Sequence, residues 1–208
     1  AELVFVDYEP LTAVVTVNDS LAAAQLVHPA MEGNIAGALP IAPSEIDFSE
    51  CDVVVAQVVI NNRVAGAPIE GRSALADWTG ERLLCWSSTQ GAGVVLNNIV
   101  DLYDVEESDV HVRAVDIGGG FGSKGSPDGE ELSLPALSKA VGRPVQWTET
   151  RSENMVNMVQ GRAQQQTVRI GGTAEGDITH YALHVVQDSG AYVDVGAVLP
   201  MLTMMMAP

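Results

Sequence analysis

The chain carries near its middle the stretch Val115-Asp116-Ile117-Gly118-Gly119-Gly120-Phe121-Gly122-Ser123-Lys124, which places four glycines within five residues. The residues that lead to the glycines, from Val110 to Ile117, alternate between apolar and polar as a β-strand does. Glycine has no Cβ, so such a loop can adopt positive φ angles and lets a ligand approach its backbone closely. Successive N–H groups there can donate to a phosphate, or to the sulfur and oxygen atoms of a metal dithiolene. The stretch predicts a strand followed by a ligand-binding segment, residues 118–124, called the glycine loop below.

The glycine loop also matches a dinucleotide-binding fingerprint, because Gly120-Phe121-Gly122-Ser123-Lys124-Gly125 reads G-x-G-x-x-G and Glu149 ends the next predicted strand. Two features oppose this alternative. Residues 126–129 delay the following helix, whereas a dinucleotide fold starts its helix inside the glycines. The preceding strands are also predicted to form hairpins rather than crossovers. A Walker phosphate loop is excluded, because Lys124 is neither preceded by Gly nor followed by Ser or Thr.

The segments around the loop predict an α+β fold. Upstream, strands over 73–78 and 82–87 form a hairpin, and residues 92–102 have helical spacing. Downstream, a helix over 130–141 ends at Gly142, with Pro135 indicating a kink or a later start, and a strand follows over 144–148. Glu130 and Glu131 are interpreted as charges that complement the dipole of that helix. A second hairpin is expected from strands over 164–170 and 178–186.

The first part of the chain predicts a separate unit. Residues 3–8 and 13–17 alternate as a strand pair would, and residues 28–50 lose this periodicity and contain several prolines, as an extended linker does. Residues 52–61 are mostly Val, Ile and Ala, a pattern typical of a strand buried on both faces. We expect domain boundaries at 1–27, 28–50 and 51–208, with sequence missing on both sides.

Composition excludes several classes of partner. The chain has 27 acidic against 10 basic residues and a formal net charge of -17, which disfavours nucleic acid and anionic lipid. No apolar run reaches the roughly 18 residues that a membrane span needs. The two cysteines, Cys51 and Cys85, fit neither a zinc knuckle nor a disulfide framework. These features predict a cytoplasmic protein without a membrane span.

Several segments, in order, resemble the molybdopterin-binding large subunit of the xanthine dehydrogenase, aldehyde oxidase and aerobic carbon monoxide dehydrogenase family. The glycine loop with Asp116 and Ile117 resembles that family's D-[VI]-G-G-G-F-G-x-K element. The neighbouring segments that also resemble it are Phe5-Val6-Asp7-Tyr8-Glu9-Pro10-Leu11, Trp86-Ser87-Ser88-Thr89-Gln90, Gly142-Arg143-Pro144-Val145 and Trp147-Thr148-Glu149-Thr150-Arg151-Ser152-Glu153-Asn154-Met155. The chain is therefore identified as a fragment of such a subunit.

The resemblance implies a fold and a site. Residues 1–27 would end an α/β hammerhead domain, and residues 51–208 would form the first molybdopterin-binding subdomain, incomplete, with a mixed sheet and flanking helices. The cofactor would be molybdopterin, as a cytosine dinucleotide, with molybdenum. The implied cofactor-binding residues are Gln90, Gly118, Gly119, Gly120, Phe121 and Gly122, and the implied metal-site residues are Phe121 and Asn62. Asn62 stands where the family places a glutamine, and Gly125 where xanthine-oxidising members carry a glutamate, which argues against a purine substrate.

The resemblance also implies an activity, the hydroxylation of an aldehyde, an N-heterocycle or carbon monoxide with water as oxygen source. The catalytic base would come from beyond residue 208, so no catalytic residue is assigned here and the fragment alone would be inactive. Iron–sulfur clusters and FAD would lie on partner subunits or domains, with the rest of the large subunit, in a dimer of heterotrimers. The alternative is a non-catalytic or degenerate module of the same family, because Asn62 and Gly125 depart from the familiar pattern.

Overall fold

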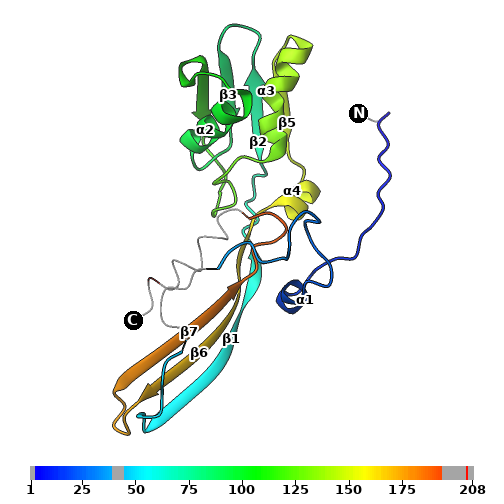
Figure 1. Ribbon diagram of the computed structural model, residues 1–208. Coiled ribbons are helices and arrows are strands. Elements are labelled where there is room, and N and C mark those ends of the chain that lie inside the picture. Colours follow the sequence, from blue (N-terminus) through cyan, green and yellow to red (C-terminus); the bar gives the residue numbers. More distant parts are fainter. Residues whose placement is uncertain (1–2, 39–44, 194–204, 206–208) are drawn as a thin grey trace. The chain divides into compact units, whose positions relative to one another are not determined.

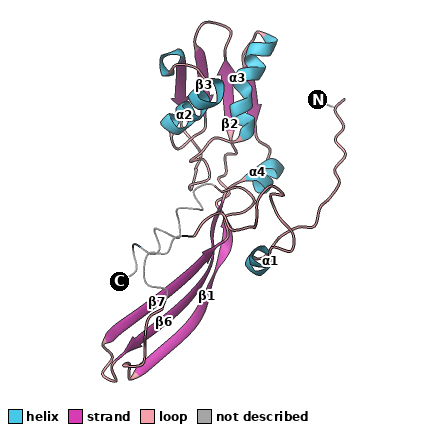
Figure 2. Ribbon diagram, in the orientation of Figure 1, coloured by secondary structure: helices cyan, strands magenta, loops and turns pink. Residues whose placement is uncertain are grey.

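The computed structural model describes residues 3–38, 45–193 and 205. The chain divides into two compact units, one made of residues 1–62 and 163–208 and the other of residues 63–162. Figures 1 and 2 show their helices and strands. The fold is α+β, as predicted, and each unit is described by itself below. Within the described residues, no helix combines the length and the apolar character that a membrane crossing requires.

The unit of residues 63–162 contains a four-stranded sheet in the order β4-β3-β2-β5. Strands β2 (Ser73–Asp77) and β3 (Leu83–Ser87) form the predicted antiparallel hairpin, and β5 (Val145–Thr148) lies antiparallel to β2. Strand β4 (Val110–Ala114) pairs in parallel with β3, so the sheet is mixed. Strand β4 ends three residues before the predicted end at Ile117, and the backbone then enters the glycine loop.

The parallel pair of β3 and β4 corrects one sequence interpretation. Helix α2 (Ala92–Tyr103) and the short 3-10 helix η1 (Glu107–Asp109) connect these two strands, so the connection before the glycine loop is a crossover and not a hairpin. Strand alternation alone does not reveal the direction of a neighbouring strand. The helix itself was predicted over 92–102 and is confirmed.

The core of this unit lies between the sheet and two helices. Small or aliphatic side chains of β2, β3 and β4 form one hydrophobic cluster with side chains of α2 and α3 (Gly129–Val141), and Figure 1 shows both helices on the same face of the sheet. The buried apolar members are Ala74, Ala76, Leu83, Cys85, Val95, Ile99, Val110 and Leu134. Burial raises the pKa of the Cys85 thiol to about 12, as expected for an inert core cysteine. These contacts fix the sheet edge from which the glycine loop begins.

Helix α3 ends at Gly142, which adopts a left-handed conformation with φ of 65°, as the sequence predicts. Its start is at Gly129, with the buried Pro135 inside the helix, so the alternative of a later start is wrong. Helix α4 (Arg151–Asn157) follows β5 and begins with a capping box in which Thr150 Oγ1 accepts from the Glu153 amide. The Thr150 amide donates to Glu153 Oε2 at 2.7 Å, and this bond, followed by a side-chain hydrogen bond from Thr150 to the carboxylate, lowers the pKa of Glu153.

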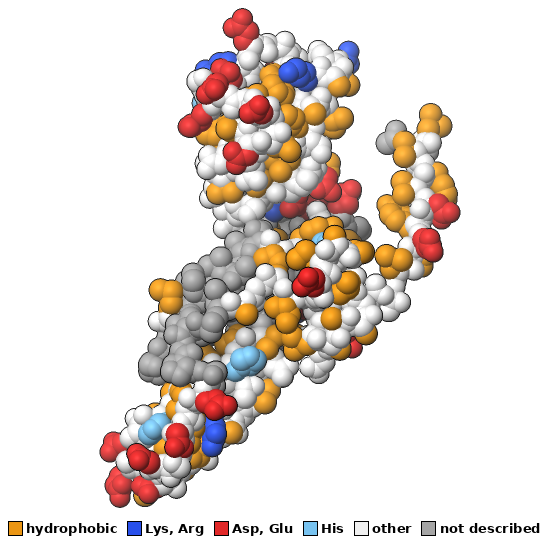
Figure 3. All heavy atoms as spheres, in the orientation of Figure 1, with side chains coloured by type: hydrophobic (Ala, Val, Ile, Leu, Met, Phe, Trp, Pro, Cys, Tyr) orange, Lys and Arg blue, Asp and Glu red, His pale blue; other side chains and the backbone are white. Residues whose placement is uncertain are grey.

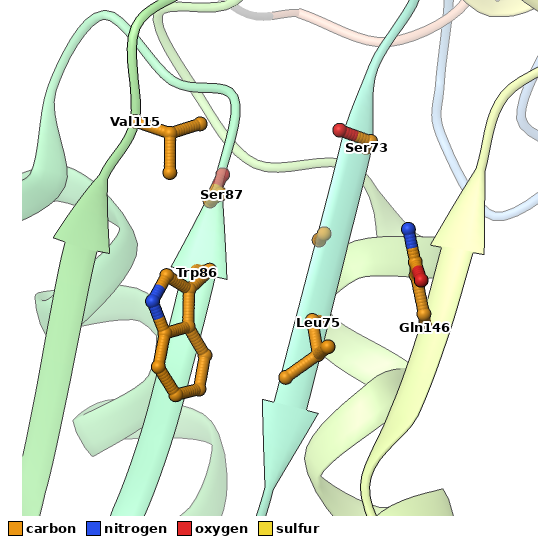
Figure 4. Close-up of a pocket in the computed structure, with 7 residues that line it drawn as sticks. Ser73, Leu75, Trp86, Ser87, Val115 and Gln146 are labelled. Atoms are coloured by element: carbon orange, nitrogen blue, oxygen red, sulfur yellow. The ribbon is translucent and has the colours of Figure 1, made fainter.

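The opposite face of the four-stranded sheet carries a shallow cavity of about 320 Å³ (Figure 4). Leu75, Trp86, Val115 and Gln146 are among its lining residues, and the Arg113 guanidinium lies 5.7 Å from the centre of the Trp86 ring. No residue of the glycine loop lines this cavity. It is therefore separate from the site described below.

The other unit contains a three-stranded sheet in the order β1-β6-β7. Strands β6 (Gln160–Gly172) and β7 (Ile178–Gln187) confirm the predicted second hairpin. Strand β1 (Val53–Ala65) is also present, but the prediction that it is buried on both faces is wrong, because nearly all its side chains are exposed among the described residues. An apolar pattern indicates that the side chains of a strand need a surface to pack against. It does not show that the same chain supplies that surface.

The predicted strand pair over 3–8 and 13–17 is wrong. The described part of this region has no strand, and the short helix α1 (Val17–Ala22) begins after Thr16, whose Oγ1 accepts from the Asp19 amide at 3.1 Å. Leu3 and Phe5 are 101% and 89% exposed, so this segment packs on nothing that would stabilise a strand pair. Residues 28–38 and 45–50 have no helix or strand, and residues 39–44 of the predicted linker lie outside the described residues.

Acidic side chains predominate among the charged residues of the chain. On the face shown in Figure 3, acidic side chains outnumber basic ones, as the formal net charge of -17 implies. Such a surface opposes binding of a polyanion.

Candidate functional site

The glycine loop connects β4 to the residues before α3, and its backbone is unusual. Gly119, Phe121 and Gly122 have φ angles of 96°, 52° and 88°. Glycine adopts such angles without cost, but a left-handed phenylalanine is uncommon. The Phe121 side chain is 76% exposed, so its own packing does not stabilise this conformation. Backbone strain combined with an exposed aromatic ring is the kind of feature that gathers at ligand-binding sites.

The Glu70 carboxylate binds both ends of the glycine loop. Its Oε2 accepts from the Gly118 amide at 2.6 Å and from Lys124 Nζ at 2.9 Å. The amide and, after it, the ammonium hold the pKa of Glu70 below its usual range, because both donors favour the ionised carboxylate. Lys124 is only 1% exposed, so its charge is buried against this one anion. Glu70 thereby fixes the distance between the first and last residues of the loop.

Gln90 binds the other part of the loop. Its side-chain Oε1 accepts from the backbone amides of Gly122 at 2.9 Å and Lys124 at 3.2 Å. The backbone amide of Gln90 donates to the Lys124 carbonyl at 2.9 Å. Only the oxygen of a glutamine side chain can accept, so these two contacts fix the orientation of the side-chain amide. Gln90 lies two residues before α2, in the segment that leads from β3 to this helix. The hairpin and the crossover helix thus deliver this glutamine to the loop.

Close packing explains two of the glycines. A Cβ at Gly118 would lie 2.7 Å from the Glu70 Cβ, and a Cβ at Gly120 would overlap the side-chain amide of Gln90. The sequence interpretation, that the glycines open the backbone to a ligand, is therefore incomplete at these positions. A Cβ at Gly122 would meet nothing within 4 Å, and there the positive φ requires glycine.

Several hydrogen-bond donors of the site remain available. In the described part of the chain, the consecutive amides of Gly119, Gly120 and Phe121 donate to no protein acceptor, and neither does Gln90 Nε2. Successive backbone donors with positive φ angles bind phosphate oxygens or the sulfur and oxygen atoms of a metal dithiolene. The donor set therefore fits a cofactor that carries such groups.

The structure brings together most of the residues that the sequence assigned to the cofactor. Gln90 contacts the loop that contains Gly118, Gly119, Gly120, Phe121 and Gly122. Asn62 lies on β1 in the other compact unit and is exposed. The described residues contain no group of three or more His, Cys, Asp or Glu side chains that could hold a metal ion.

Sequence reasoning missed the charged residues beneath the loop. Glu131, interpreted as a helix-dipole charge, is 6% exposed and accepts from Arg72 Nη1 at 2.7 Å. Neither Glu70 nor Arg72 was singled out from the sequence. The available signal was the closeness in sequence of Glu70 and Arg72 just before a strand with buried small residues. Charges at that position must find partners when the strand is buried.

A dinucleotide-binding fold requires a helix that starts inside the glycines. Helix α3 begins at Gly129, after the glycines, so its N-terminus is not formed by them, as the sequence indicates. The crossover through α2 removes the second objection to that alternative, but the first one remains.

Comparisons with known proteins also indicate a cofactor-binding domain. Residues 27–208 match the family described as a molybdopterin cofactor-binding domain. The nicotine 6-hydroxylase large subunit of Paenarthrobacter nicotinovorans is 39% identical over 147 residues, which cover 70% of this chain and 18% of that protein. The carbon monoxide dehydrogenase large chain of Afipia carboxidovorans is 29% identical over 151 residues, covering 72% and 19%.

Among solved structures, quinoline 2-oxidoreductase from Pseudomonas putida 86 aligns with a TM-score of 0.83 and 31% identity, over 92% of this chain and 25% of that chain. The chain spans about a fifth of the length of the curated relatives named above.

Proposed function

The chain belongs to the molybdopterin cofactor-binding domain family, and from this premise we propose that its glycine loop and Gln90 form one wall of the cofactor site of a molybdenum hydroxylase. The observation that carries the proposal is the run of three unpaired amides at Gly119, Gly120 and Phe121, beside the unpaired Nε2 of Gln90, within the described residues. These donors match the anionic and sulfur-bearing groups of such a cofactor.

Each residue of the site has a distinct proposed role. The three amides bind and orient the cofactor, and Gln90 Nε2 donates to it while Oε1 holds the loop. The exposed ring of Phe121 would cover the bound cofactor and limit the access of water to it. When bound, the molybdenum cofactor supplies the oxidation–reduction chemistry. For the metal site, Phe121 and Asn62 stay the proposed neighbours, with Asn62 acting through a bridging water because its side chain is shorter than glutamine.

For the whole protein we propose the hydroxylation of a small molecule with water as the oxygen source. An N-heterocycle is the first candidate substrate, because two relatives are named for nicotine and quinoline, and an aldehyde or carbon monoxide follow. The catalytic base is proposed to lie outside these 208 residues. The non-catalytic alternative is not favoured, because the relatives are named as subunits of enzymes.

The proposed partners are iron–sulfur and FAD-containing subunits or domains, arranged with the rest of the large subunit as a dimer of heterotrimers. In support, one relative is named as subunit gamma of the 6-hydroxypseudooxynicotine dehydrogenase complex, at 29% identity over 199 residues. The cytosine dinucleotide form of the cofactor, the boundaries at 1–27, 28–50 and 51–208, and the cytoplasmic location stay predictions from the sequence.

Metal and pterin analysis of the full-length protein tests the proposal. Purified with its partners, the protein should contain about one molybdenum and one releasable pterin per chain, the ratio of a single cofactor site. A protein that is fully assembled with its partners and free of both would contradict it. Titration with NADH provides the matched test of the dinucleotide alternative, for which a saturable change in fluorescence would be expected.

A further inference from the structure

A buried ion cluster lies directly beneath the glycine loop. It consists of Arg72, Asp128 and Glu131, called the Arg72 cluster below. Arg72 is 3% exposed, and its Nε and Nη1 lie 2.9 Å from Asp128 Oδ2 and 2.7 Å from Glu131 Oε2. Its Nη2 donates to the backbone carbonyl of Ser123, inside the loop. The rigid guanidinium therefore uses all three nitrogens at once, which a lysine cannot do.

Glu131 extends the cluster to the segment that carries Gln90. Its Oε1 accepts from Ser87 Oγ at 2.8 Å, and its Oε2 accepts from the Asp128 amide at 3.1 Å as well as from Arg72. Ser87 is the last residue of β3, and the chain continues from it through two buried residues to Gln90. One carboxylate thus joins the glycine loop, through Arg72 and Ser123, to the segment that presents Gln90.

A second set of contacts fixes Arg72 itself. The Arg72 amide donates to Glu149 Oε2 at 2.8 Å, and the Glu149 amide returns a bond to the Arg72 carbonyl at 2.9 Å. Glu149 Oε2 also accepts from Asn154 Nδ2 at 2.9 Å. Both Glu149 and Asn154 are buried. The backbone of Arg72 is therefore held independently of its guanidinium, so a change in the side chain can alter the loop without displacing the strand.

We propose that Arg72 is a positioning residue for the cofactor site, which sets the loop against Gln90 through the Arg72 cluster. It acts through Ser123 and Glu131 and does not itself touch the cofactor. This role rests on the proposed function, because it assigns to the cluster the geometry in which the loop amides meet a ligand. The cluster contains two carboxylates and one guanidinium in a buried place, an arrangement that is costly unless its geometry is satisfied at every contact.

Hydrogen exchange of the loop tests the proposal in the full-length protein. Arg72→Lys keeps the positive charge but loses the three-nitrogen guanidinium group. Amides in residues 118–125 should then exchange about tenfold faster, which is the effect of losing one charged hydrogen bond. The amides of β2 and β3 should stay protected. Molybdenum and pterin content should fall in the same variant. Ser87→Ala, which removes the second link without touching a charge, should shift loop exchange in the same direction, by a smaller factor.

Arg113→Lys is the matched control, because Arg113 is an exposed arginine of the same sheet that contacts Trp86 and not the loop. It should leave loop exchange unchanged. If Arg72→Lys fails to fold, Ser87→Ala decides alone. Unchanged loop exchange in the folded variants would overturn the positioning role. Faster loop exchange in a protein that contains no molybdenum even as wild type would leave the positioning role in place and instead contradict the proposed function.

Discussion

Lys124 Nζ lies 2.9 Å from Glu70 Oε2, and the same oxygen accepts from the amide at the opposite end of the glycine loop, so one carboxylate holds both ends of the loop. Replacing Glu70 by Gln leaves an almost fully buried ammonium without its anion. We expect the free energy of unfolding of the full-length protein to fall by roughly 1–3 kcal/mol, the cost of an unsatisfied buried group in a partly exposed pair. Urea denaturation of the apo protein measures this change.

The double variant Glu70→Gln with Lys124→Met isolates the pair. Removing both charges should cost less than the sum of the single changes, because neither charge is then left alone. Glu81→Gln, at an exposed position in the β2–β3 turn, is the control and should have no measurable effect. Additive effects of the two changes would show that Glu70 and Lys124 do not interact.

A methyl group at Gly120 should separate Gln90 from the loop. Gly120→Ala places a Cβ where the side-chain amide of Gln90 lies, so Gln90 must move and release the amides of Gly122 and Lys124. We expect cofactor content to fall at least tenfold, which corresponds to about 1.4 kcal/mol of lost binding. Gly93→Ala is the control, because nothing lies within 4 Å of its Cβ and alanine favours the helix α2. Equal cofactor content in both variants would disprove this role of Gly120.

Phe121→Ala should reduce cofactor binding and leave the stability of the apo protein almost unchanged. Since the ring is 76% exposed, its loss should change the free energy of unfolding of the apo protein by less than about 0.5 kcal/mol. Cofactor content should nevertheless decrease, because the ring is proposed to cover the cofactor. Thermal denaturation of the apo protein and pterin release from the purified protein measure the two effects. A large loss of stability with unchanged cofactor content would assign Phe121 to the fold instead.

Asp128 should give the protein a pH-dependent stability. Burial raises the pKa of this carboxyl from 3.8 to about 6, although the Arg72 charge acts in the opposite direction and Glu131, Glu130 and Glu149 raise it further. A raised carboxyl pKa means that the folded state binds the proton more tightly. Its contribution to stability is therefore present below pH 3.8 and is lost as the pH rises through about 6.

The variant Asp128→Asn cannot ionise, so its stability relative to the wild type should increase as the pH is raised from 4 to 6 and stay constant above that. Thermal denaturation of both proteins across this range gives the difference. Glu70 has a lowered pKa, so its contribution to stability has the opposite pH dependence. This contribution is the same in both proteins and cancels in the difference. A difference that does not vary with pH would contradict the buried environment of Asp128.

The sequence predicts the parts of this fold that depend on local pattern. The hairpin around Thr79 and Gly80, the helix after Gln90 and the glycine that ends α3 were all expected, because turn residues and helical periodicity act over a few residues. The parallel pairing of β4 with β3 was not, since alternation has no direction. The expected strand before Pro10 also failed, because a strand needs a partner that this segment lacks among the described residues.

The residues of the candidate site also differ in how well local sequence pattern predicts them. The glycines and Gln90 could be found from a motif, but the residues that shape the loop could not. Glu70 binds Lys124 and Arg72 binds Glu131, and in both pairs the partners are far apart in the sequence, so the pairing is a property of three-dimensional packing. Glu131 shows the limit most clearly, because a carboxylate in the first turn of a helix has the same local pattern whether it is solvated or, as here, buried against Arg72.

The most direct test of the central claim is an anomalous difference map, recorded at the molybdenum absorption edge from crystals of the full-length protein. We expect one strong peak per chain, with cofactor density that reaches the amides of Gly119, Gly120 and Phe121. A molybdenum peak whose cofactor density lies away from these amides and from Gln90, in a crystal that shows the glycine loop, would contradict it.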